Sequence, residues 1–411
     1  MKKIISVVSL AVLLSGGSAW ASAYRIPEQS VNSTAKAGAY VASADGVDAS
    51  YYNPANMSWM SGDTWQLEGD LAYIHLPSVS YTDNRSANLN GESEKENFLL
   101  PTLFMVSPEY NDFRIGFSVT APYGLSKRWE QPYPRTFAEE YSLKVIDINP
   151  TISYKLCDYF SLAAGPRVLY SAAKVSSNGV VPGGYTASRF MEGDTAELGW
   201  NAALSARPTK EMTLAVTYRS HVDLDLEGDA LLYTNLPVPS STVHTGGGVT
   251  VPAPAVLSIS AAYTFDKLTV DLTWDRTFWS EYETLAFQYD TALTNPVLIG
   301  VFGGSRDKNW QDSNGYRLGF SYELNELWTL MAGFGYDESP VPDATLLFDL
   351  PDSDGFLYSA GVRYQLNAQM ELGAGYLYDY KKSRSVNNGI VNGTFTDSAA
   401  HLLTVGLTYT F

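Results

Sequence analysis

The sequence is poor in the residue types on which disulfides, metal centres and nucleic-acid contacts depend. It has one cysteine, Cys157, and four histidines among 411 residues. A single cysteine cannot form an internal disulfide. The 27 Lys and Arg are outnumbered by 44 Asp and Glu, which gives a net charge of −17. This balance argues against a nucleic-acid ligand, because phosphates are bound by Lys and Arg.

Long apolar runs are also lacking. After the first two dozen residues no run of about 18 apolar residues occurs, so the sequence predicts no transmembrane helix. Metal-ligand spacings, a Walker loop and a dinucleotide-binding motif are absent as well. The sequence therefore predicts no enzyme, no bound metal and no cofactor.

The N-terminus has the form of a secretory signal peptide. Lys2 and Lys3 precede the apolar run Ile4–Leu14, and Ala19-Trp20-Ala21 fits the cleavage pattern. An N-terminal membrane anchor is the alternative, but the run is too short to span a bilayer. We expect residues 1–21 to be removed, so that the mature chain begins at Ser22.

The C-terminus predicts a β-strand with one apolar face. Apolar side chains fall on Leu403, Val405, Leu407, Tyr409 and Phe411, with small or polar residues between them. This period of two is that of a strand. Outer-membrane β-barrels use such a strand, ending in an aromatic residue, to close and to be recognised by the barrel-assembly machinery.

The same alternation recurs along the chain and predicts about fourteen strands between Asp63 and Phe411. The clearest stretches are 65–73, 113–120, 198–205, 268–275, 316–322, 356–365 and 370–379. Residues 97–107 do not alternate cleanly, and only their neighbours indicate a strand. An even strand count suits a single-chain bacterial barrel. The fold class is therefore an all-β membrane protein, an antiparallel transmembrane β-barrel over residues 61–411.

Short and long connections alternate between these strands. Turns are predicted at 110–112, 157–158, 208–210, 266–267, 325–326 and 367, and long loops near 77–96, 129–139, 177–193, 228–250, 290–305 and 387–396. Short turns on one side and long loops on the extracellular side are typical of outer-membrane barrels.

Charges on the face opposite the apolar one favour a barrel over a soluble β-sandwich or propeller. They are Glu68, Asp147, Arg167, Arg219, Asp223, Asp271 and Arg363. A sandwich core would not accept so many, whereas a barrel lumen would. We expect His221 to face the lumen too.

Residues 22–60 do not alternate. They are small, polar and Ala-rich, yet they include apolar residues to bury and too few charges to favour disorder. A lumen as wide as that of a fourteen-stranded barrel needs a plug if it is not to be an open pore. This segment is predicted to be that plug.

Several motifs resemble the FadL/TodX family of outer-membrane transporters. The N-terminal ones are 22–30 and 44–55, which ends in Asn53-Pro54-Ala55. Further matches are 121–125, 217–220, Trp274 with 279–280, and 336–342. Asn56 departs from the pattern, where the family often has Gly, and the 177–193 loop is shorter than in some members.

The resemblance implies diffusive uptake of long-chain fatty acids, or of aromatic and other hydrophobic compounds, without ATP hydrolysis or a covalent step. Extracellular loops would capture the solute from the lipopolysaccharide leaflet and pass it to an apolar pocket above an N-terminal hatch. It would leave sideways through the wall after the hatch shifts. The implied hatch and gate residues are Tyr24, Arg25, Ile26, Asn53, Pro54 and Ala55.

Two further sites follow. Pro122, Tyr123 and Gly124 interrupt the third strand, where proline removes a ladder donor and glycine permits a bulge. The family's lateral opening lies at this strand, although the trio could instead begin a loop above the membrane. Loop 228–250 carries Leu231, Leu232, Tyr233 and Leu236, an apolar cluster that either binds ligand or packs against another loop.

The resemblance also implies a basic residue near Trp310-Gln311-Asp312 for a fatty-acid carboxylate. Arg306 is the candidate, with Lys308 as its neighbour. Either could be a solvated loop charge, and a neutral hydrocarbon would need no cation.

Other functions fit the sequence less well. An open porin needs no plug, and a phospholipase needs a Ser-His pair, yet none of His75, His221, His244 and His401 lies in a motif. Aromatic hydrocarbon uptake and a structural or adhesin barrel remain alternatives. The barrel is expected to be monomeric and to lie in the bacterial outer membrane.

Overall fold

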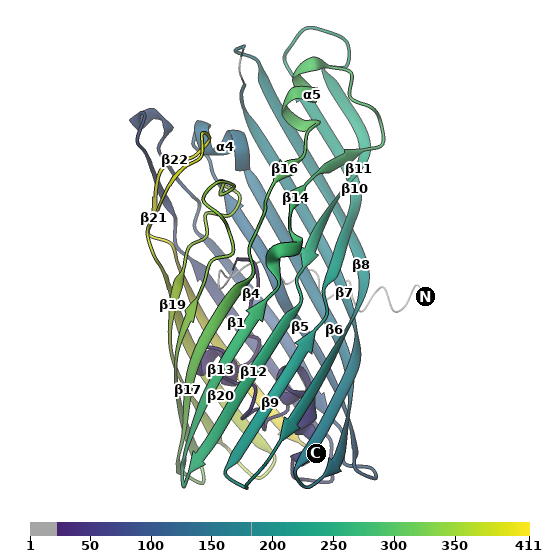
Figure 1. The fold of residues 1–411 in the computed structure, drawn as a ribbon, viewed down its shortest axis with the longest axis vertical. Coiled ribbons are helices and arrows are strands. Elements are labelled where there is room, and N and C mark those ends of the chain that lie inside the picture. Colours follow the sequence, from purple (N-terminus) through teal and green to yellow (C-terminus); the bar gives the residue numbers. More distant parts are fainter. Residues whose placement is uncertain (1–22, 182) are drawn as a thin grey trace.

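The computed structural model describes residues 23–411 except residue 182, so the expected signal peptide lies outside the described residues. The chain forms a closed antiparallel barrel of fourteen wall strands (Figure 1). The predicted fold class is confirmed. No helix among the described residues is long and apolar enough to cross a membrane.

Each wall strand pairs with the next along the chain. The first six are β1 (Gln66–Leu76), β4 (Glu96–Val106), β5 (Phe113–Arg128), β6 (Glu140–Cys157), β7 (Phe160–Val180) and β8 (Thr186–Ala206). Two wall strands are each made of two pieces, β9 (Met212–Arg219) with β10 (Val222–Thr234), and β11 (Thr242–Ala253) with β12 (Val256–Phe265). The wall continues with β13 (Leu268–Thr277), β17 (Ser313–Asn325), β18 (Trp328–Asp337), β19 (Gly355–Gln365), β20 (Met370–Lys381) and β23 (Ala399–Thr410). Pairing of β1 with β23 closes the barrel.

Smaller elements lie in the extracellular connections. β2 (Ser80–Asp83), β3 (Gly91–Glu92), β21 (Arg384–Asn387) and β22 (Asn392–Thr396) form one small sheet, next to η2 (Ala87–Leu89). β14 (Thr284–Leu285) pairs with β16 (Arg306–Asp307), and β15 (Phe287–Tyr289) pairs with β11. The helices are α4 (Pro132–Ala138), η3 (Trp279–Glu281) and α5 (Pro296–Phe302).

The alternation in the sequence sets which side chains face outward. In β23 Leu403 is 47% exposed on the outer face, whereas the next residue, Thr404, is buried inside. The irregular stretch 97–107 coincides with β4, which pairs with β1 over its whole length. A wall that faces lipid requires apolar side chains on its outer face, because lipid and not other protein covers them.

The charges predicted to face the lumen do so, except for Asp223. Its side chain is 62% exposed, because β10 starts anew after Ser220 and turns Val222 and Leu224 inward. His221 also differs from the prediction, since its ring lies 2.9 Å from Asp223 and 2.8 Å from Glu281 rather than in the lumen. The break between β9 and β10 thus changes which residues of the alternating pattern face the lumen.

Two predicted long loops, 177–193 and 228–250, are wrong. β7 continues to Val180 and β8 begins at Thr186, and β10 and β11 continue to a turn at 235–241. These hairpins rise to the upper end of the barrel beside α5 (Figure 1). Their sequences lack the lipid-facing apolar alternation, since an extension above the bilayer has no lipid to face. Because the alternation is missing, the sequence predicted loops at these positions.

Residues 23–60, here called the N-terminal segment, are packed inside the barrel. Their helices α2 (Val31–Ala35), α3 (Ala49–Tyr52) and η1 (Pro54–Trp59) lie in its lower half, in purple in Figure 1. Lumen charges hold the segment: Lys36 pairs with Asp271 at 3.1 Å, Arg317 donates to the carbonyl oxygen of Ala37, and Arg363 donates to Asn32. These buried charges are therefore partnered across the contact between segment and wall.

Close packing of this segment depends on a wall glycine. A Cβ at Gly333 would lie 2.2 Å from the carbonyl carbon of Lys36, whereas one at Gly69 would meet nothing within 4 Å. We expect Gly333→Ala to lower the free energy of unfolding by about 1–3 kcal/mol, measured by denaturant unfolding in detergent. Gly69→Ala is the matched control, and equal stability of the two variants would contradict this packing.

Candidate transport site

The wall has a window between β4 and β5. The two strands pair only from Leu103↔Val119 to Val106↔Gly116. Above these pairs, residues 96–102 have no ladder partner on β5, and contact resumes where the amide of Glu94 donates to the carbonyl oxygen of Arg128 at 2.9 Å. This unpaired stretch, here called the β4–β5 window, is closed at both ends.

A bulge in β5 lies on one edge of this window. The register of β5 on β6 shifts between Thr120 and Tyr123, so β5 carries one extra residue there. Thr120 faces inward below the bulge, and Tyr123 faces inward above it, where its hydroxyl donates to the carbonyl oxygen of Pro254. The sequence predicted a break at Pro122 and Gly124, and the bulge is located there.

The N-terminal segment supplies the partners that β5 lacks. The amide of Ile26 donates to the carbonyl oxygen of Pro122, and the amide of Gly124 donates to that of Tyr24, both at 2.8 Å. The Gln29 side chain accepts from the amide of Ala121 at 2.7 Å and donates to its carbonyl oxygen at 3.1 Å. Residues 24–26 thus pair with the edge of β5 like a short extra strand, and the Gln29 side chain extends this contact to Ala121.

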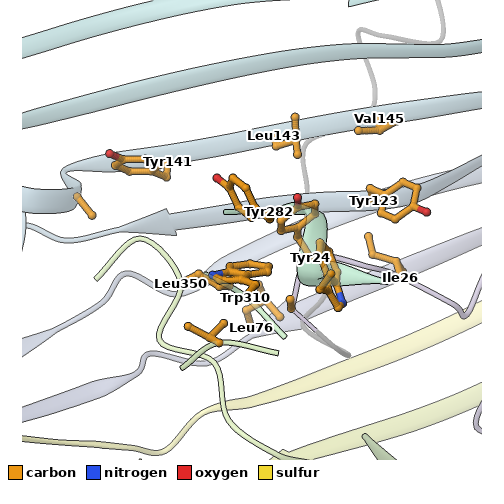
Figure 2. Packing of buried hydrophobic residues seen from close by; sticks show 14 of the residues in the cluster. Tyr24, Ile26, Leu76, Tyr123, Tyr141, Leu143, Val145, Tyr282, Trp310 and Leu350 are labelled. Atoms are coloured by element: carbon orange, nitrogen blue, oxygen red, sulfur yellow. The ribbon is translucent and has the colours of Figure 1, made fainter. Parts of the chain in front are cut away.

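Tyr24 of this stretch also forms the floor of an apolar pocket, among the packed side chains drawn in Figure 2. Tyr24 packs edge-on against Trp279 at 4.6 Å and lies 5.7 Å from Trp310, and its hydroxyl donates to the carbonyl oxygen of Pro252. The other lining residues are mostly apolar and include Leu125, Tyr141, Leu143, Val175, Val249, Val251, Tyr282, Leu285, Phe287 and Leu350. Such a lining is typical of a site for a hydrophobic small molecule.

Lys308 and Asp349 are the charged pair at this pocket. The Lys308 ammonium lies 2.6 Å from an oxygen of Asp349. Burial raises the pKa of the Asp349 carboxyl, but Lys308 outweighs burial and holds that pKa below its usual value. Lys308 is therefore already neutralised. Arg306, the candidate cation from sequence, is half-buried in β16 opposite Leu285 and does not line the pocket.

The structure places a second cation, Arg189, next to this pocket. It lies on β8 with 2% exposure, donates to the Tyr141 hydroxyl and lies 3.7 Å above the ring of Phe287. Among the described residues it makes no ion pair with a carboxylate. The sequence did not indicate Arg189, because it falls in the stretch 177–193 that was predicted to be a loop. Had this stretch been predicted as a strand, a single charged residue on its lumen-facing side would have indicated a site.

Comparison with known proteins agrees with this architecture. The sequence profile of a family described as outer membrane protein transport protein (OMPP1/FadL/TodX) matches residues 12–411. The chain belongs to this family. It is accordingly an outer-membrane transport protein rather than an enzyme.

Individual members of the family are distant in sequence. A long-chain fatty acid transport protein of Escherichia coli O6:H1 is 25% identical, with 99% of this chain and 98% of that protein covered. The fold is similar to a Pseudomonas aeruginosa FadL homologue (TM-score 0.82, 20% identity, 95% and 100% covered). It is also similar to the Ralstonia pickettii toluene transporter TbuX (TM-score 0.69, 16% identity, 93% and 98% covered).

The remaining residues that the family resemblance singled out lie in three places. Arg25 reaches Asp275 at 3.5 Å, beside the β5 bulge. Asn53 donates to Ser205 of β8, and the carbonyl oxygen of Ala55, which follows Pro54, accepts from Ser161 of β7. The contacts of Asn53 and Ala55 attach the lower part of the N-terminal segment to the wall.

The apolar cluster assigned to a loop lies on and just beyond β10. Leu232 is buried against Leu298 and Phe302, both on α5. Tyr233 is 44% exposed, and Leu231 and Leu236 are half-buried. Leu232 therefore packs against another extracellular element, and its neighbours leave apolar surface at the top of the barrel.

Gln29 gives a direct test of how the window is closed. Gln29→Leu keeps the side-chain volume but leaves the Ala121 amide and carbonyl without a partner, which costs about 1–3 kcal/mol. We expect amide exchange at Ala121 to become roughly tenfold faster or more, measured by hydrogen exchange on a β5 peptide. Gln66→Leu, which removes only a bond to Ser61, is the control. Unchanged exchange at Ala121 would contradict the role of Gln29.

Proposed function

We propose that this protein carries long-chain fatty acids across the outer membrane by passive diffusion, and that residues 22–60 act as its hatch. The observation that carries the proposal is the double role of residues 24–29. Tyr24 lines the floor of the apolar pocket, while the backbone of Tyr24 and Ile26 and the side chain of Gln29 bond to the edge of β5 at the β4–β5 window. A ligand that displaces this floor therefore opens the wall at the same time.

The route that we infer runs from the extracellular apolar surface to the pocket and then sideways. Below Tyr24 a second small cavity is lined by Arg25, Pro122 and Tyr123. It lies between the pocket floor and the bulge. A shift of Tyr24, Arg25 and Ile26 would join the two cavities and let the ligand leave between β4 and β5 into the bilayer.

A straight path through the hatch would be costly for an apolar solute. The periplasmic side of the lumen is a cavity of about 470 Å³ lined mostly by polar and charged side chains. Between it and the pocket lies the N-terminal segment, which is held by the ion pair of Lys36 with Asp271 and by Arg363, a residue that pairs with Glu68 of the wall and donates to Asn32. Lateral exit avoids breaking these contacts.

Arg189 supports an acidic head group on the ligand. A buried guanidinium without a counter-ion is unfavourable, and a fatty-acid carboxylate would supply one. Lys308 is already neutralised by Asp349. Solved structures of similar fold include toluene transporters, and a neutral aromatic ligand is the second candidate, because the pocket lining is itself aromatic.

The exit route predicts the effect of a regular third strand. Pro122→Val combined with Gly124→Val restores a ladder donor and removes the flexible glycine. We expect uptake of radiolabelled oleate by cells lacking their own transporter to fall about tenfold or more, while oleate binding to the purified barrel persists. Pro166→Val with Gly69→Val, at wall positions on β7 and β1 that do not line the break in β5, should transport normally. Full uptake by the window variant would refute lateral exit at this strand.

The head-group assignment predicts a selective loss of binding. Arg189→Gln should weaken oleate binding at pH 8 by roughly 10–100-fold, since a charge-assisted hydrogen bond contributes about 1.5–3 kcal/mol. Toluene binding should not change. Arg306→Gln is the comparison variant. If only Arg306→Gln weakens oleate, the carboxylate site lies in β16; if neither variant does, the ligand needs no cation.

A further inference from the structure

The outer face of the barrel carries a row of polar side chains at the seam where the barrel closes. Asn97 of β4, His75 of β1, His401 of β23 and Tyr378 of β20 lie directly opposite one another across four neighbouring strands. The next row toward the periplasm is apolar and aromatic, with Leu99, Tyr73, Leu403 and Tyr376. The polar row therefore lies at the upper edge of the lipid-facing band.

His75 and His401 are paired within this row. They are opposite residues of β1 and β23, and their rings are 5.9 Å apart with an interplanar angle of 34°. Both side chains are half-buried and point outward, because Ile74 and Leu402 next to them point inward. Two imidazoles so placed can approach one ion by small side-chain rotations.

The hydrogen bonds of both rings leave the same nitrogen available. The Nδ1 atom of His75 lies 2.8 Å from the side-chain oxygen of Asn97, which can only accept, so Nδ1 carries the proton. The Nδ1 atom of His401 lies 2.8 Å from the Tyr376 hydroxyl. Among residues 23–411 described here, no hydrogen bond or ion pair involves Nε2 of either ring. In the neutral His75 ring the lone pair is therefore on the outward Nε2.

For His75 this arrangement is that of a metal-binding histidine, whose second nitrogen donates to a fixed acceptor that sets the tautomer; in His401 the Tyr376 hydroxyl occupies the same nitrogen. It suits an anion less well, because a neutral Nε2 accepts and the row contains no Lys or Arg. We propose that His75 and His401 together bind a borderline divalent cation such as Cu²⁺ or Zn²⁺, with water or headgroup oxygens as the other ligands. The ion would join the first strand of the barrel to the last.

The test uses the mature chain in detergent, purified without a histidine tag, and Cu²⁺ as the probe, because Cu²⁺ binds most tightly in its series. Electron paramagnetic resonance should show two coordinated imidazole nitrogens in the wild type. His75→Gln and His401→Gln should each weaken binding by roughly tenfold or more. His244→Gln, an exposed histidine on β11, should have no effect.

Binding as tight as that of the wild type in either seam variant, or binding weakened in His244→Gln, would overturn the proposal. Heat-modifiable migration on gels checks that each variant is a folded barrel. A second measurement needs no variant: Zn²⁺ should protect His75 and His401, and not His244, from diethyl pyrocarbonate in the wild type. Equal modification of the three histidines with and without Zn²⁺ would also overturn it.

Discussion

A membrane-spanning sheet cannot leave backbone amides and carbonyls without partners, and the rest of this structure depends on how that constraint is met at β5. The bulge at Ala121 and Pro122 separates the upper part of β5 from β4. The missing hydrogen bonds are replaced by residues 24–29 of the N-terminal segment. The wall is thus complete only while the segment is in place.

The attachment of the segment is uneven along its length. Its lower part is fixed by buried ion pairs and by hydrogen bonds from Arg317 and Arg363, and wall glycines let its backbone lie directly on the sheet. Residues 24–26 have no buried lysine or arginine ion pair of the kind that fixes the lower part. They are held by two backbone hydrogen bonds, by the Tyr24 hydroxyl, by a bond from Gln29 to the carbonyl oxygen of Ile26, and by contacts of 3.4 and 3.5 Å from the part-exposed Arg25 to Thr277 and Asp275. The end that closes the window is therefore the end that costs least to move, and a ligand in the pocket touches it.

Much of this fold could be predicted from the sequence, because lipid on one side and a polar lumen on the other impose a strict period of two. The period located β1, β5, β13 and β23 and the lumen-facing Glu68 and Arg363. It did not reveal the extracellular hairpins around Arg189 and Leu232, where no lipid imposes the pattern. It also placed Asp223 on the wrong face, because the strand is interrupted at Ser220 and the amino-acid sequence does not indicate this interruption. The break at Pro122 was visible in the sequence. Gln29, which bonds to the adjacent Ala121 and lies 92 residues before it, was not.

The most direct test is to lock residues 24–26 onto β5 and measure transport. Arg25 and Tyr123 are cross-strand partners, a geometry that a disulfide can span. In a chain with Cys157→Ser, the double variant Arg25→Cys and Tyr123→Cys should block oleate uptake when oxidised and regain it on reduction. Equal uptake in the oxidised and reduced states would contradict the claim that this segment must leave the window for the ligand to pass.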